Sequence, residues 1–185
     1  MTDLSAHAIL ARNKTSLKET SCNDQSPNNP YMTNSSLEVI NFDAVKTEYI
    51  DSLHLSEVPK SNDALLQKKD GSLVFVEFKG GQLNQRLLYD LRKKIYDSIL
   101  ILGDILGETI SHTRMNLDYV LVHSDKAFGT PPSLDYIVKS VAENAKEKHI
   151  QGGLNAFKSY CFREVATLTT DEFEEYLKTK FSETR

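Results

Sequence analysis

Three charged side chains have the types and the spacing needed to bind a metal ion and activate water. Asp63 stands at the start of one apolar run, and Glu77 and Lys79 stand near the end of the next, in Val76-Glu77-Phe78-Lys79. Because alternate side chains of a strand share one face, Glu77 and Lys79 point the same way. Two carboxylates with water suit Mg²⁺, and a nearby lysine can orient or deprotonate the attacking water and stabilise phosphoryl charge. The trio therefore indicates metal-assisted hydrolysis.

The segment between the two apolar runs positions these side chains. It contains Asp70-Gly71, and an Asp-Gly pair between β-prone runs is a strong hairpin signal. Pairing through that turn sets Asp63 near Lys79 and within a residue or two of the level of Glu77. We therefore expect both carboxylates and the ammonium to converge at one end of a hairpin.

Further elements are expected on both sides of the hairpin. Ser35 and Glu38 form a capping-box pattern that predicts a helix over about 36–55. A long helix with an apolar stripe follows the hairpin and ends near Gly107. After it we expect a strand over 117–123, a helix over 133–149, a strand over 160–168 and a final helix from the Thr169/Glu172 capping box to about Phe181. This order predicts an α/β protein with sheet and helix layers.

The length and composition indicate one folded domain. The chain has 185 residues, which is an ordinary size for a single domain. Residues 1–34 are rich in Asn, Ser, Thr and Lys without a sustained apolar period, so we expect a flexible N-terminal tail followed by a single domain over 35–185. No apolar run approaches the ~20 residues of a membrane span. Cys22 and Cys161 form no metal or disulfide pattern, and a cytoplasmic, reducing compartment fits best.

The order Asp63, hairpin, Glu77-x-Lys79 resembles the core of the PD-(D/E)xK nuclease superfamily. The resemblance implies a restriction-endonuclease-like mixed sheet flanked by helices, with an α-β-β-β-α-β core. The helix, strand and helix expected after residue 133 add an extra C-terminal helix-strand-helix to that core. It implies that Asp63 and Glu77 bind Mg²⁺ or Mn²⁺, that the Phe78 carbonyl adds a ligand, and that Lys79 is the catalytic residue serving the water. Only two strands are predicted before the long helix, whereas the superfamily core has three there, and the third is expected within 55–61.

The same resemblance implies two further groups of site residues. An acid on the first helix often completes such metal sites, and Glu48 is the candidate, with Glu38 behind it. Gln85 and Tyr89 match the Q-x-x-x-Y signature of the RecB-like branch.

The charge distribution also favours a nucleic-acid partner. The net charge is −4, yet residues 60–94 hold eight basic against four acidic side chains. On the long helix Gln85, Tyr89, Arg92 and Tyr96 form a polar and aromatic stripe flanked by Lys93 and Lys94, a face that can hold phosphates or stack a base. By resemblance DNA is favoured over RNA, and a homodimer is possible.

Other interpretations of these residues remain open. Glu77 and Lys79 also suit a same-face salt bridge on a strand, and Arg92-Lys93-Lys94 suits a solvated helix face. The favoured function is a metal-dependent nuclease acting in defence, repair or mobile-element biology. The alternative is a catalytically inactive nuclease-fold module, such as an immunity or regulatory protein, that binds a protein or a nucleic acid.

Overall fold

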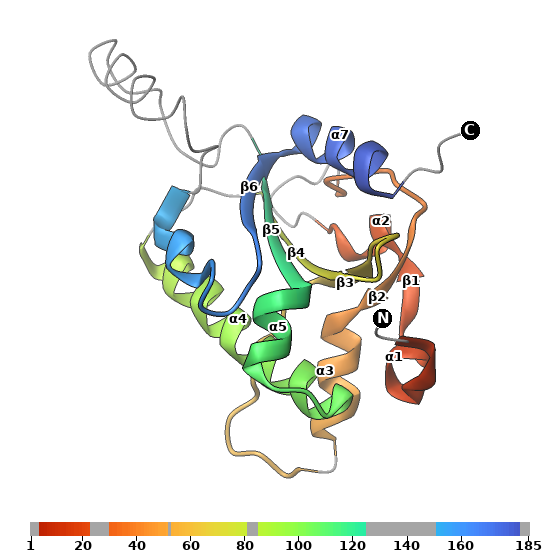
Figure 1. The fold of residues 1–185 in the computed structure, drawn as a ribbon, viewed down its shortest axis with the longest axis vertical. Helices are drawn as coiled ribbons and strands as arrows, with labels where there is room; N and C mark the ends of the chain where they lie inside the picture. Colours follow the sequence, from red (N-terminus) through yellow and green to blue (C-terminus); the bar gives the residue numbers. More distant parts are fainter. Residues whose placement is uncertain (1–3, 23–29, 52, 81–84, 125–150, 182–185) are drawn as a thin grey trace.

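A six-stranded mixed sheet forms the centre of the computed structural model, which describes residues 4–22, 30–51, 53–80, 85–124 and 151–181. The strands lie in sequence order across the sheet. They are β1 (Lys14–Ser16), β2 (Glu38–Asn41), β3 (Ala64–Gln67), β4 (Leu73–Lys79), β5 (Leu117–His123) and β6 (Val165–Thr169). Helices flank the sheet (Figure 1), so the expected α/β class with a mixed sheet is confirmed.

The sheet changes from antiparallel to parallel pairing at β4. Strands β1 to β4 pair antiparallel, whereas β5 pairs parallel to β4 and β6 parallel to β5. The β3–β4 hairpin turns where predicted, with Gly71 at a φ of +81° and the Asp70 carboxylate accepting the Ser72 N–H at 2.9 Å. A parallel pair needs a long crossover, and α4 (Gln85–Leu106) and α5 (Ile110–Asn116) supply it between β4 and β5.

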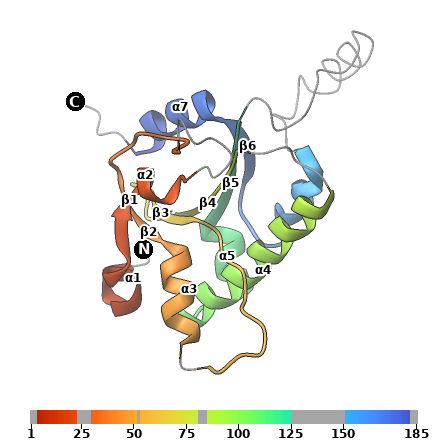
Figure 2. The same cartoon turned by 180° about the vertical axis from the view of Figure 1, so that it is seen from behind.

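Each face of the sheet has its own apolar core. One core packs alternate residues such as Phe75 of β4 against α4, α3 (Phe42–Ile50), α1 (Ala8–Arg12) and the 3-10 helix η2 (Gln151–Phe157). The other packs Val74 and Val76 against α2 (Leu17–Thr20) and α7 (Thr170–Lys180). The two views of Figures 1 and 2 show α4 and α7 on opposite sides of the sheet. Strands β4 and β5 are covered on both faces, which explains their continuous apolar runs.

The two best-patterned helices form as predicted. In α4 the apolar stripe Leu91, Ile95 and Leu102 is buried against the sheet, and the helix ends just before Gly107, whose φ is +67°. In α7 the capping box is complete, because the Thr169 hydroxyl accepts the Glu172 N–H and the Glu172 carboxylate accepts the Thr169 N–H.

The expected first helix is wrong in its first part. Residues 38–41 form β2, and the helix α3 begins at Phe42 with Asn41 as its N-cap. The Ser35 hydroxyl accepts the Leu37 N–H rather than capping a helix. β2 also replaces the strand expected within 55–61, which contains no strand. Val39 and Ile40 bury into opposite cores, which only an extended chain permits.

The expected N-terminal tail is also wrong over residues 4–22. This segment contains the 3-10 helix η1 (Leu4–Ala6), α1, β1 and α2. β1 pairs with β2, and Leu10 and Leu17 are fully buried in opposite cores. Two apolar anchors and one strand pairing order a segment whose composition is polar. The helix expected over 133–149 lies outside the described residues, and the strand expected over 160–168 is the shorter β6.

Candidate active site

The β3–β4 hairpin places Asp63 directly opposite Glu77. Ala64 pairs with Val76 in an antiparallel register, so Asp63, just before β3, faces Glu77 of β4. The Asp63 carboxylate accepts the Phe78 N–H at 2.7 Å, which fixes it against the end of β4. The convergence predicted from the turn is therefore confirmed for the two carboxylates.

Two lysines complete what we call the Glu77 cluster, consisting of Asp63, Glu77, Lys79 and Lys94. The Glu77 Oε1 atom lies 2.5 Å from the Lys79 Nζ and 2.7 Å from the Lys94 Nζ. The Lys94 Nζ also lies 3.1 Å from the Asp63 Oδ1. The Lys94 ammonium of α4 thus bridges both carboxylates. Among the described acidic side chains, the Lys79 ammonium of β4 lies within ion-pair distance of Glu77 only.

The Glu77 cluster lies between the sheet and α4 with little access to water. The Glu77 side chain is 0% exposed, and those of Asp63, Lys79 and Lys94 are 15%, 20% and 19% exposed. Burial and the neighbouring Glu77 charge raise the pKa of Asp63 to about 7 against the opposing effect of the two lysines. Burial opposes the charged form of Lys94, but the Glu77 and Asp63 carboxylates outweigh it and raise the pKa of this ammonium.

Several buried polar side-chain atoms have no hydrogen-bond partner among the described residues. They include the second carboxylate oxygen of Glu77, Oε2, and the hydroxyl of Tyr119 on β5. Burial, followed by the charges of Glu77 and Asp63, raises the pKa of Tyr119. The Asn62 amide, next to Asp63, is unpartnered as well. Buried polar atoms are rarely left unpaired, so the unpartnered Glu77 Oε2 is suited to a polar or ionic ligand.

The donor set fits a hard divalent cation in part. Asp63 and Glu77 provide carboxylate oxygens, including the unpartnered Glu77 Oε2, and Mg²⁺ is commonly held by one or two carboxylates with water completing its shell. Within the described ranges no three His, Cys, Asp or Glu side chains come together as a metal site. Any cation here would therefore depend on two carboxylates, water and backbone oxygen.

Glu48 does not join the cluster. Its carboxylate is ion-paired with Arg12 and accepts a hydrogen bond from the Asn13 side chain at 2.8 Å. These hydrogen bonds, from Arg12 and then Asn13, lower the pKa of Glu48. Glu38, the second candidate, lies on β2 and pairs with Lys14 at 2.7 Å. For Glu38 the expected helix is replaced by β2, which removes the basis of that prediction. Glu48 does lie on helix α3 as expected, but its carboxylate pairs with Arg12 and Asn13 instead of the cluster.

Asp43 is the acid of α3 whose charge acts on the Glu77 cluster, and it was not predicted from the sequence. Its carboxylate accepts the Ser61 hydroxyl at 2.5 Å, and its charge contributes to raising the pKa of Lys94. Asp43 lies in the first turn of α3. No signal pointed to it, because the expected helix started six residues too early for Asp43 to be a first-turn residue.

The residues expected to contact nucleic acid divide into two groups. Tyr89 is 70% exposed and Arg92 is exposed, so the outer face of α4 offers an aromatic ring and a guanidinium. Lys93 approaches Glu57 at 3.8 Å, and Lys94 faces inward to the Glu77 cluster. Gln85 begins α4, and its side chain lies outside the described residues.

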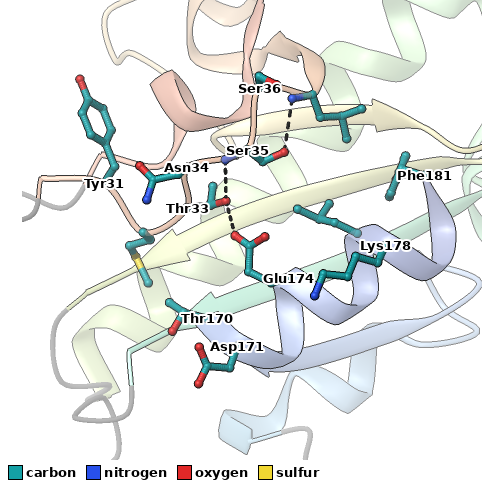
Figure 3. A pocket seen from close by; sticks show the side chains of 13 residues that line it. Tyr31, Thr33, Asn34, Ser35, Ser36, Thr170, Asp171, Glu174, Lys178 and Phe181 are labelled. Carbon is teal, nitrogen blue, oxygen red and sulfur yellow. Dashed lines mark hydrogen bonds between the residues drawn. The ribbon is translucent and has the colours of Figure 1, made fainter. Parts of the chain in front are cut away.

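A polar groove on the opposite face is separate from the Glu77 cluster. Segment 31–37 and helix α7 line it (Figure 3). The Thr33 hydroxyl donates to Glu174 at 2.5 Å and accepts the Ser35 N–H at 3.1 Å, so hydrogen bonds join the two walls. Helix α7 packs on the side of the sheet away from α4, and the groove therefore contributes no residue to the candidate active site.

Comparison with known protein families, curated proteins and solved structures finds no relative of this chain. In the part of the chain described, none of the helices combines the length and the apolar character needed to cross a membrane.

Proposed function

We propose that this protein is a divalent-metal-dependent nuclease of the PD-(D/E)xK type, with a restriction-endonuclease-like fold, that hydrolyses phosphodiester bonds, of DNA in the first place. One observation carries the proposal: Asp63, Glu77 and Lys79 converge at one end of the β3–β4 hairpin. The order of the strands supports it, since three antiparallel strands lead into a helical crossover and a parallel fourth strand.

Asp63 and Glu77 would hold Mg²⁺ or Mn²⁺, with the Phe78 carbonyl as a further candidate ligand. Such an ion neutralises developing phosphoryl charge and lowers the pKa of a bound water. The protein's own contribution is positional. The Phe78 N–H fixes the Asp63 carboxylate, and Glu77 holds the Lys79 ammonium 2.5 Å away on the same face of β4. Lys79 thereby orients the attacking water and stabilises negative charge on the phosphate.

The outer face of α4 supplies contacts for the polymer in this proposal. Tyr89 and Tyr96 are 70% and 47% exposed, and Arg92 lies exposed between them. Aromatic rings stack on bases of any sequence, and a guanidinium pairs with phosphate oxygens. This face stands on the same helix as Lys94, which links the polymer contacts to the cluster.

A second candidate function is a catalytically inactive binding module. The observation that favours it is the Lys94 ammonium, which bridges Asp63 and Glu77. Two carboxylates and two ammoniums balance in charge, so the cluster is compatible with a purely structural role. Metal uptake separates the two functions, because a structural cluster has no reason to bind Mn²⁺ or Mg²⁺.

A cleavage panel tests the nuclease. Linear, circular and single-stranded DNA and RNA are incubated with Mn²⁺, Mg²⁺ or EDTA and the wild type, Lys79→Ala, Asp63→Ala or the control Lys178→Ala. Lys178 is an exposed, ion-paired lysine of α7 on the far side of the sheet. We expect cleavage only with metal, and a loss of about 10²–10⁴-fold in the two cluster variants. Absence of both cleavage and calorimetric metal binding in the wild type would refute the nuclease and favour the binding module.

A further inference from the structure

Lys94 stands where a cation shared by Asp63 and Glu77 would stand. We propose that the Lys94 ammonium is a tethered competitor of the divalent cation, so that the ion binds only when this side chain withdraws. The inference rests on the proposed function, because it takes Asp63 and Glu77 as the cation's ligands. It adds a regulatory element on α4 that the Asp63, Glu77 and Lys79 pattern does not contain.

The contacts of Lys94 are those of an ion shared by two ligands. Its Nζ lies 3.1 Å from the Asp63 Oδ1 and 2.7 Å from the Glu77 Oε1. Mg²⁺ needs its oxygen ligands at about 2.0–2.1 Å. A divalent cation bridging the same two oxygens would overlap the ammonium, so the two are mutually exclusive occupants.

Charge balance leads to the same conclusion. The Glu77 cluster contains two carboxylates and two ammoniums, and none of these side chains is more than 20% exposed. Adding a divalent cation with both lysines in place would leave a double positive excess in a poorly hydrated space, which is costly. Withdrawal of Lys94 halves that excess, whereas Lys79 contacts only Glu77 of this pair and is free to remain.

Helix α4 offers the withdrawn ammonium other partners. Asp90 lies four residues before Lys94 and Asp97 three residues after it, and these spacings place their carboxylates on neighbouring positions of the helix surface. Both are close to solvent and already attract a second segment, since Lys60 contacts Asp90 through its Nζ at 2.6 Å and Asp97 through its N–H at 2.7 Å. A lysine side chain has the length and flexibility to exchange between such sites.

The test measures Mn²⁺ affinity without nucleic acid. Calorimetric titrations compare the wild type with Lys94→Met, which keeps the length of the side chain and removes its charge. The matched control is Lys68→Met, which removes another buried lysine, 8% exposed and ion-paired with Asp118. We expect at least tenfold tighter Mn²⁺ binding in Lys94→Met and no change in Lys68→Met. Equal affinity of the wild type and Lys94→Met, or absence of binding in Lys94→Met, would overturn the proposal.

Two additional readouts protect the test from a folding defect. If Lys94→Met is unfolded in EDTA, its melting temperature is followed against Mn²⁺, and recovery of folding at concentrations that leave the wild type unchanged supports the competitor. Lys94→Arg retains the charge, so it is expected to bind Mn²⁺ no more tightly than the wild type. Tenfold tighter binding by Lys94→Arg would contradict the proposed competition.

Cleavage by the wild type, measured in parallel, distinguishes failure of this inference from failure of the proposed function. Tighter Mn²⁺ binding in Lys94→Met without cleavage of any substrate by the wild type would leave the competitor established and the nuclease refuted. Metal-dependent cleavage by the wild type without an affinity gain in Lys94→Met would leave the nuclease established and the competitor refuted.

Discussion

Two buried ionic clusters lie at opposite ends of the same sheet, and they differ in how completely their carboxylate oxygens are hydrogen-bonded. The Glu77 cluster stands where β4 ends, on the α4 side. The second, which we call the Asp118 cluster, consists of Lys68, Asp118 and Arg163 and stands where β5 begins. In the Asp118 cluster both carboxylate oxygens accept hydrogen bonds, at 2.9 and 3.0 Å from Arg163 and also from Lys68. In the Glu77 cluster the Glu77 Oε2 accepts none from the described residues.

The difference extends to the pKa values of the acids. Burial alone would raise the pKa of Asp118, but the hydrogen bonds from Arg163 and Lys68 outweigh it and lower the pKa. Burial and the Glu77 charge raise the pKa of Asp63 to about 7. A satisfied buried ion pair fixes a structure, whereas an unsatisfied one that persists in a fold suggests a functional site. The comparison therefore favours the Glu77 cluster over the Asp118 cluster as the candidate functional site.

The largest contrast is expected in stability. Asp118→Ala leaves Lys68 buried without its carboxylate, and removing one partner of a buried pair costs about 3–5 kcal/mol. Asp63→Asn removes a charge that its surroundings disfavour and keeps an oxygen for the Phe78 N–H, so at pH 8, where the wild-type carboxylate is ionised, we expect the stability to be kept or raised. Urea unfolding at pH 8 in EDTA measures both variants. Equal costs would remove the distinction between the clusters.

The two clusters also predict opposite responses of stability to pH. The folded-state pKa of Asp63 is about 7, above an unfolded value near 4, so the folded protein keeps a proton that the unfolded chain releases between these values. Stability therefore falls as the pH rises from about 4 to 7. The lowered pKa of Asp118 instead gives stability that is lost as the pH falls below about 4.

Unfolding titrations across pH 3–8 in EDTA check these slopes variant by variant. Asp63→Asn is expected to flatten the profile between pH 4 and 7 and leave the acid limb unchanged. Asp118→Asn is expected to do the reverse. A wild-type profile that rises with pH between 4 and 7, or an Asp63→Asn profile identical to it, would show that Asp63 is not held protonated by the fold.

A smaller effect is expected at Tyr119, whose hydroxyl is buried without a partner in the described residues. Tyr119→Phe removes that unpaired group and keeps the ring that stacks on Phe162 at 5.3 Å. We expect a gain of about 1 kcal/mol in the metal-free protein, since an unsatisfied buried donor costs about 1–3 kcal/mol. Thermal unfolding in EDTA measures it, and a loss of stability would mean that the hydroxyl is already satisfied.

The smallest effect is expected at Glu48. Its partners are Arg12 and Asn13 rather than the Glu77 cluster. Glu48→Gln should leave the Mn²⁺ affinity of the protein unchanged, while Glu77→Gln should abolish binding. A matching loss of Mn²⁺ binding in Glu48→Gln would restore Glu48 to the site and place a third acid in it.

The sequence predicted the parts of the site that depend on local chemistry. The Asp70-Gly71 turn predicted the hairpin and the meeting of Asp63 with the end of β4, although Asp63 lies opposite Glu77, two residues from the Lys79 level expected. The capping box at Thr169 and the apolar stripe over the long helix correctly predicted α7 and α4. Each of these features is encoded within a few neighbouring residues, so a single sequence is sufficient to predict them.

The features that sequence analysis missed depend on contacts between distant segments. Short strands such as β1 and β2 have weak patterns of their own and form because each completes the other's hydrogen bonds. Lys94 stood in Arg92-Lys93-Lys94, which suited a solvated face. Its spacing from the buried Leu91 and Ser98, three residues before and four after, was the signal that it faces the sheet.

Hydrolysis itself is the most direct test of the claim that the Glu77 cluster is a catalytic site. A labelled DNA substrate is incubated with the wild type or Glu77→Gln, in Mn²⁺ and in EDTA, after both proteins are shown to fold. We expect cleavage by the wild type in Mn²⁺, none in EDTA, and a rate at least about 100-fold lower for Glu77→Gln. Equal rates for the two proteins, or cleavage that persists in EDTA, would contradict it.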